Sequence, residues 1–122
     1  MNANPLALVV EDDPQQSEIF SQALKQAGYV VEACSDGQKT LDHLANATPH
    51  IVVLDLNLPT VSGDQILAYI RSEPRLETIR VILATANPRQ AELLRGDSDL
   101  VLIKPISFTQ LKTLAERLHP ER

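Results

Sequence analysis

Short apolar runs alternate with amphipathic segments along the chain. Runs rich in Val, Ile and Leu predict strands near residues 6–11, 29–34, 50–55, 80–85 and 99–103. Between these runs apolar residues recur at helical spacing, most clearly within residues 19–27 and 108–118. Strands that alternate with helices predict a parallel sheet, because right-handed crossover helices pack back onto the sheet. The pattern therefore indicates an α/β fold with helices on both faces of one sheet.

The length of the chain narrows the fold further. A closed eight-stranded α/β barrel takes about 250 residues, whereas this chain has 122. We therefore expect a five-stranded, doubly wound parallel sheet in the flavodoxin-like order 2-1-3-4-5. The run at 29–34 is the most mixed in polarity and is typical of an edge strand. We expect one domain over residues 1–122, with a core at about 5–119 and no output domain in this chain.

Helix boundaries are legible in the sequence. Asp13-Pro14 and Asn87-Pro88 each place an N-cap side chain before a proline at the first helical position. Ser62 and Ser107 are each followed three residues later by Gln, the pattern of a capping box. Gly28 follows the first helical stripe and predicts its C-terminal stop.

Four of the predicted strands run directly into polar residues. The first is followed by Glu11-Asp12-Asp13, the third ends at Asp55, the fourth ends at Thr85, and the fifth is followed by Lys104. An ionised acid at the end of a buried strand needs partners or water. Ligands of doubly wound sheets bind at the carboxyl ends of the strands, near the switch between the first and third. We therefore expect these side chains to meet at one edge.

Convergent carboxylates constrain the chemistry of such an edge. At about 4 Å and an effective dielectric of about 20, each pair of like charges costs about 4 kcal/mol. Oxygen ligands without His or Cys favour a hard cation, and Mg2+ is held by one or two carboxylates with waters and phosphate oxygens. Asp12 and Asp55 are the best ligand candidates, and Asn57 could add a backbone carbonyl. A carboxylate beside Mg2+ could accept a phosphoryl group, with Lys104 and Thr85 contacting its oxygens.

These residues match a known family in order and spacing. The chain resembles the receiver domain of two-component response regulators over nearly its whole length. The matching segments are Val9-Val10-Glu11-Asp12-Asp13-Pro14, Asp55-Leu56-Asn57-Leu58-Pro59 with Gly63, Thr85-Ala86, and Lys104-Pro105. Each is weak alone, but four in order at strand ends are specific.

The resemblance implies a role for each of these residues. It implies Asp55 as phosphoacceptor, Glu11 and Asp12 as an acidic pair, Asn57 as a carbonyl ligand of Mg2+, Thr85 as switch residue and Lys104 as phosphoryl-binding lysine. Asp12 and Asp55 would bind the metal directly and Glu11 indirectly. The family's Lys-Pro bond is commonly cis, which implies the same for Lys104-Pro105. Asp13 is better explained as a helix cap than as a ligand.

Two departures from the family concern how a signal is read. Receivers usually carry Tyr or Phe three residues before the lysine, where this chain has Val101. The segment from Thr85 through Gly96 also looks about a turn short, which predicts a truncated fourth helix. We expect Val101 in the core, and we interpret Arg71, Arg75, Arg80, Arg89 and Arg95 as a solvated set.

Composition excludes several other classes of function. The net charge is -5 and no basic cluster stands out, which argues against direct binding of nucleic acid. No apolar stretch approaches the roughly 20 residues of a membrane helix. Cys34 is the only cysteine, which precludes an internal disulfide and suits a reducing cytoplasm.

The leading hypothesis is a phosphoprotein of two-component signal transduction that is not an enzyme beyond its own phosphorylation and dephosphorylation. The phosphoryl group would come from a sensor histidine kinase or phosphotransfer protein. The signal would pass to an effector protein or detached output domain, and a phosphorylation-dependent dimer is a further option. Two alternatives stay open: a degenerate receiver that only binds partners, and a small aspartyl-phosphate phosphatase of the haloacid dehalogenase kind. A flavodoxin-type FMN carrier fits poorly, because Glu11-Asp12-Asp13 would repel a phosphate.

Overall fold

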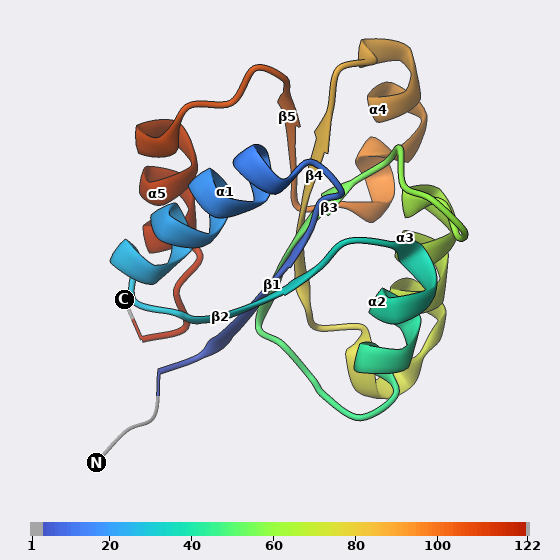
Figure 1. The fold of residues 1–122 in the computed structure, drawn as a ribbon. Coiled ribbons are helices and arrows are strands. Elements are labelled where there is room, and N and C mark those ends of the chain that lie inside the picture. Colours follow the sequence, from blue (N-terminus) through green and yellow to red (C-terminus); the bar gives the residue numbers. More distant parts are fainter. Residues whose placement is uncertain (1–3, 122) are drawn as a thin grey trace.

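The chain folds around one parallel sheet, as Figure 1 shows. The computed structural model describes residues 4–121. The sheet has the order β2-β1-β3-β4-β5, and every neighbouring pair is parallel. Its strands are β1 (Leu6–Val10), β2 (Val30–Cys34), β3 (Ile51–Asp55), β4 (Arg80–Thr85) and β5 (Leu100–Ile103). This confirms the predicted fold class, the strand order and the position of β2 at an edge.

Helices cover both faces of the sheet. On one face lie α1 (Pro14–Gln26) and α5 (Phe108–Arg117), and on the other lie α2 (Gly37–Leu44), α3 (Gly63–Ser72) and α4 (Pro88–Leu94). Two short 3-10 turns, η1 (Pro74–Leu76) and η2 (Arg95–Asp97), follow α3 and α4. None of the helices within residues 4–121 has the length and apolar content needed to span a membrane.

Side-chain alternation along the strands divides the core into two clusters. In β1, Ala7 and Val9 pack with α1 and α5, whereas Leu8 and Val10 pack in the cluster that includes α3. All five residues of β3 are buried, which fits a central strand covered on both faces. The site-bearing end of β3 is therefore fixed by packing on both sides.

The predicted helix boundaries are confirmed. Asp13 Oδ1 accepts the N–H groups of Gln15 and Gln16 at 2.9 and 3.3 Å, so it caps α1. Asn87 caps α4 through two N–H groups in the same way, and Ser107 caps α5 by accepting the N–H of Gln110. Gly28 has φ 101°, a left-handed conformation that favours glycine after a helix.

The fourth helix is short, as predicted. It has seven residues, of which Ala91 alone is buried, and η2 follows directly. Val101 is half-buried rather than fully buried and packs against the cluster that also receives Leu94.

The interpretation of five arginines as one solvated set is wrong for Arg71. Its guanidinium donates to the carbonyls of Glu77, Ile79 and Asp97 at 3.0, 2.8 and 2.7 Å. Arg75 also contacts a carbonyl, that of Leu44. Every residue type has a backbone carbonyl, so no sequence pattern predicts such contacts.

The contact between α5 and the start of β2 provides a test of the fold. Tyr29 is 3% exposed and its hydroxyl donates to the Ala115 carbonyl at 2.8 Å. Tyr29→Phe leaves that buried acceptor without this donor, so we expect the free energy of unfolding to fall by about 1–3 kcal/mol. Urea denaturation measures this change.

Tyr69→Phe is the matched control, because the Tyr69 side chain is half-buried and no hydrogen bond of its hydroxyl occurs within the described residues. Its unfolding free energy should stay within about 0.5 kcal/mol of the parent value. Equal losses in the two variants would contradict the importance of the Tyr29 hydrogen bond.

Candidate functional site

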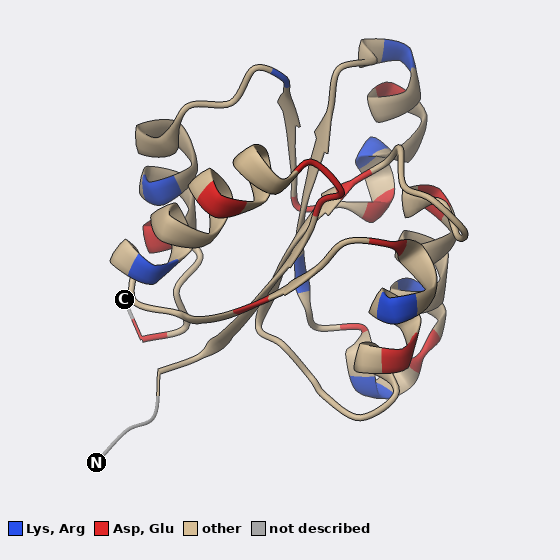
Figure 2. Cartoon of the chain, in the orientation of Figure 1, with Lys and Arg blue, Asp and Glu red and all other residues tan. Residues whose placement is uncertain are grey.

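Three carboxylates meet at the carboxyl edge of the sheet, where β1 and β3 end. Glu11 and Asp55 are 2% and 4% exposed, and Asp12 beside them is exposed. One carboxylate oxygen from each of the three lies within 4.8 Å of the others, and no other such group occurs among the described residues. Figure 2 shows the acidic turn between β1 and α1 at this edge. The predicted acidic cluster is thus assembled by the fold.

Lys104 crosses the edge from β5 to join two of these acids. Its Nζ donates to Glu11 Oε1 at 2.8 Å and to Asp55 Oδ2 at 3.3 Å. The lysine side chain is 16% exposed, against 1% for Glu11 and 6% for Asp55. The Lys104–Pro105 peptide bond is cis, as the resemblance implied.

Burial and charge act in opposite directions on this group of side chains. Burial raises the pKa of Glu11, and the nearby charge of Asp55 acts in the same direction against the hydrogen bonds from Lys104 and the Asp13 N–H. Burial lowers the pKa of Lys104, but its contacts with Glu11 and Asp55 outweigh burial and leave that pKa raised. The ammonium is therefore held in its charged form between two acids.

Backbone contacts fix the orientation of Asp55. Its Oδ1 accepts the N–H of Asn57 at 3.0 Å, so the exposed Asn57 lies just beyond the acid. Gly63, the first residue of α3, lies so close that a Cβ there would be 2.4 Å from the Asp55 carbonyl oxygen. Glycine at position 63 thus lets α3 begin directly against the strand end.

Thr85 ends β4 at the same edge and is fully buried. Its Oγ1 accepts the N–H of Asn87 at 3.0 Å, while its carbonyl accepts the Lys104 N–H at 2.8 Å. No hydrogen bond between Thr85 and Asp55 occurs within the described residues. Asp13 acts as the cap of α1, and its N–H also donates to Glu11 Oε2 at 3.1 Å.

The loop after Asp55 contains a feature that sequence reasoning missed. Thr60 has φ 68°, which is unusual for a β-branched residue, and its Oγ1 accepts the Gln38 N–H at 3.0 Å. A Cβ at Gly37 would lie 1.8 Å from the Val61 carbonyl oxygen. The start of α2 therefore clasps this loop. In the sequence, only the glycine after Asp36 could have indicated this close approach, because Thr60 is not a residue type that predicts a left-handed conformation.

The donor set fits a hard divalent cation. Three carboxylates, those of Glu11, Asp12 and Asp55, converge here, and a single ammonium balances only part of their charge. A buried acid at a strand end, a neighbouring ammonium and a hydroxyl could together hold a tetrahedral anionic group. On a doubly wound sheet, these features agree with the resemblance of the sequence to receiver domains of two-component response regulators.

Comparison with known proteins agrees with this class. The family model described as response regulator receiver domain matches residues 7–116. The chain belongs to this family of receiver domains. Among solved structures, the receiver domain of a signal transduction histidine kinase from Syntrophus aciditrophicus superposes with a TM-score of 0.83 at 28% identity. That match covers 93% of this chain and 89% of the other.

Two curated relatives illustrate the range of proteins that carry such a domain. The probable methanogenesis regulatory protein FilR2 of Methanothrix harundinacea is 33% identical, over 93% of this chain and 80% of its own. The transcriptional regulatory protein HprR of Escherichia coli is 36% identical, over 85% of this chain and 47% of its own. The chain thus spans most of one relative and about half of the other.

The raised pKa of Lys104 gives a test of the site's electrostatics. Lys104→Met leaves Glu11 and Asp55 without their shared cation, so the free energy of unfolding near pH 7 should fall. We expect a decrease of about 2 kcal/mol. This is smaller than the loss of about 3–5 kcal/mol that follows when one partner of a fully buried ion pair is removed. Because the folded pKa lies above the ordinary 10.5, the stabilisation by Lys104 is full below that pH and is lost as pH rises through the folded pKa.

Urea denaturation between neutral pH and about pH 11 would show the difference between parent and variant shrinking above the ordinary lysine pKa. Lys112→Met is the control, because Lys112 pairs with Glu116 while both side chains are about one-third exposed. Its smaller effect should lack this pattern. A Lys104→Met difference that stays constant across the range would contradict the proposed charge pairing.

Proposed function

We propose that the chain is a Mg2+-dependent phosphoacceptor of two-component signalling, phosphorylated on Asp55 by a sensor histidine kinase or phosphotransfer protein. The observation that carries this proposal is the contact of Lys104 with both Glu11 and Asp55 at a buried strand end. Such a site holds a reactive carboxylate beside a fixed cation. A purely structural ion pair would need neither the third acid nor the position at the ligand-binding edge.

Asp55 is the proposed nucleophile. One of its oxygens attacks the phosphorus of a phosphohistidine, a P–O bond forms, and the P–N bond breaks with its electron pair returning to the imidazole. Asp55 Oδ1 is held by the Asn57 N–H and Oδ2 by Lys104, so the carboxylate is oriented before reaction. Later hydrolysis of the aspartyl phosphate by water would restore the Asp55 carboxylate, so dephosphorylation would occur at the same site.

Mg2+ would be held by Asp12, Asp55 and the Asn57 carbonyl, with Glu11 acting indirectly. When bound, it supplies charge neutralisation for the phosphoryl oxygens. Lys104 would then exchange its contact with Asp55 for a contact with a phosphoryl oxygen, and its contact with Glu11 would keep it in reach. The Thr85 hydroxyl would donate a hydrogen bond to another phosphoryl oxygen.

The partners follow from this chemistry. A region similar to this chain can be a small part of a longer protein: in hybrid signal transduction histidine kinase D of Dictyostelium discoideum it covers 7% of the length. We infer a phosphohistidine donor and a downstream effector, in a cytoplasmic setting that suits the single thiol of Cys34. A phosphorylation-dependent dimer and the domain limits of 1–122 remain part of the same proposal.

The rival functions have less support. A phosphatase of the haloacid dehalogenase kind usually has a second acid two residues after the nucleophile, where this chain has Asn57. A degenerate binding module would have no need to keep Glu11, Asp12, Asp55 and Lys104 in mutual reach.

Replacement of the proposed acceptor tests the chemistry. The parent protein, incubated with Mg2+ and phosphoramidate, should gain the mass of one phosphoryl group by intact mass spectrometry. Asp55→Asn should gain none, because an amide oxygen is not an adequate nucleophile. Asp64→Asn, which alters an exposed acid in the first turn of α3, should be labelled like the parent. An adduct that survives Asp55→Asn would refute the assignment.

Metal binding can be tested without any phosphoryl donor. Asp12→Asn removes a charged oxygen ligand, so the affinity for Mg2+ should fall by about tenfold or more. A loss of about tenfold is already typical when the altered group only orients a ligand. Asp13→Asn retains a side chain that can cap α1, and its affinity should be little changed. Titration of amide chemical shifts with Mg2+ measures both. Equal losses of Mg2+ affinity in the two variants would contradict a specific ligand role for Asp12 and would indicate an effect of the total charge of the turn.

A further inference from the structure

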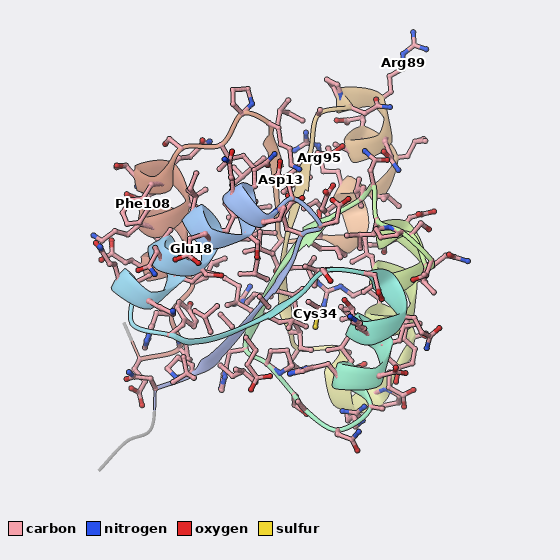
Figure 3. All side chains as sticks on the ribbon, viewed as in Figure 1. Asp13, Glu18, Cys34, Arg89, Arg95 and Phe108 are labelled. Atoms are coloured by element: carbon pink, nitrogen blue, oxygen red, sulfur yellow. The ribbon has the colours of Figure 1, made fainter. Side chains whose placement is uncertain are left out.

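The helix α4 is weakly packed, so its position depends on how its two ends are attached. Ala91 alone is buried among its seven residues, and Leu93 is 85% exposed. Figure 3 shows Arg89 extending away from the body of the protein at this helix. A helix with so few buried side chains is easily displaced once an end is released.

The amino end of α4 is attached through Thr85. The Thr85 hydroxyl oxygen accepts the N–H of Asn87, the cap residue, at 3.0 Å. Asn87 Oδ1 in turn accepts the N–H groups of Arg89 and Gln90 at 3.0 and 3.3 Å. One buried hydroxyl is therefore linked through a single cap residue to the first turn of the helix.

The carboxyl end is attached more strongly, through Arg71 in the last turn of α3. Its Nε donates to the Asp97 carbonyl in η2 at 2.7 Å, and its Nη2 contacts Asp99 Oδ2 at 3.1 Å. The same guanidinium is fixed by two carbonyls between η1 and β4, and its side chain is 23% exposed. Leu94 adds packing against the core on this side.

We propose that Arg71 is a positioning residue that makes α4 a hinge, fixed at its carboxyl end and releasable at its amino end. This rests on the proposed function, in which Thr85 turns its hydroxyl toward a phosphoryl group on Asp55. The Thr85 backbone is held to β5 by the Lys104 N–H at 2.8 Å, so the change falls on the side-chain rotamer. A new rotamer carries Oγ1 away from Asn87 and leaves its N–H without an acceptor.

The hinge explains how a signal could be read without an aromatic ring at position 101. Loss of the Asn87 contact loosens the first turn of α4, and the Arg71 contacts keep the released segment from shifting as a whole. Val101 packs against the same core cluster as Leu94, which lies at the fixed end, and need not move. The information would leave the site through the amino end of α4 and its exposed residues.

Amide hydrogen exchange on the free protein tests the two attachments separately. Thr85→Val removes the acceptor, so exchange at Asn87, Arg89 and Gln90 should rise about tenfold, the size of one lost hydrogen bond. Ser98 should be unaffected. Arg71→Met should do the opposite, raising exchange at Ser98 and leaving the amino end unchanged. Unaltered exchange in either variant would overturn the proposal.

Arg80→Met is the matched control for Arg71. Arg80 Nη1 contacts the other oxygen of Asp99 at 3.1 Å, but Arg80 reaches none of the three carbonyls that bind Arg71. Exchange at Ser98 should therefore stay at the parent value in Arg80→Met. A rise equal to that in Arg71→Met would show that charge near Asp99, rather than the guanidinium clamp, fixes this end.

The coupled state is tested with Mg2+ and beryllofluoride, a mimic of a bound phosphoryl group. Exchange should rise at residues 87–91 of the parent, with 95–98 unchanged, and in Arg71→Met the rise should extend to 95–98. If Asp55 takes up a phosphoryl group by mass yet both ends respond equally, the hinge fails and the proposed function stands. If Asp55 takes up none, the proposed function fails and takes the hinge with it.

Discussion

The contact of Lys104 with Glu11 and Asp55 is the interaction on which the rest of the site depends. It joins residues 93 and 49 positions apart in the sequence, and it brings one cation to two acids that are almost fully buried. Without it, two ionised carboxylates at that depth would repel each other, and each would lack an opposite charge. The strand order limits which residues can supply the cation. Because β4 separates β3 from β5 by two strand spacings, about 10 Å, only a long side chain from β5 reaches Asp55.

The fold and most of the site could be predicted from the sequence because each rests on a local pattern. Strand positions follow from apolar runs, and helix starts follow from Asp13-Pro14, Asn87-Pro88 and Ser107, whose caps are all seen. Residues that follow parallel strands must share an edge, so the convergence of Glu11, Asp55 and Lys104 follows from topology. A prediction of this kind needs only the strand order and the length of the side chains.

Other features could not be predicted because their partners are backbone atoms. Arg71 looks like any charged residue on a helix, and the carbonyls of Glu77, Ile79 and Asp97 that it binds have no signature in the sequence. Thr60 is similar: its left-handed conformation favours Gly or Asn, and its partner is the backbone N–H of Gln38 in α2. Val101 was predicted to lie in the core and is only half-buried, because β5 is an edge strand of the sheet.

The proposed phosphoryl chemistry and its proposed readout make opposite physical demands, and different parts of the structure suit each of them. The acidic edge needs fixed charges, so its residues are buried and its strand ends are held by packing on both faces. A readout needs an element whose two arrangements differ little in free energy, because one small ligand can shift an equilibrium only by its differential affinity. A seven-residue helix with one buried side chain meets that need. The absence of an aromatic ring at position 101 is then no defect, because fewer packed side chains at α4 leave less free energy for a phosphoryl group to overcome.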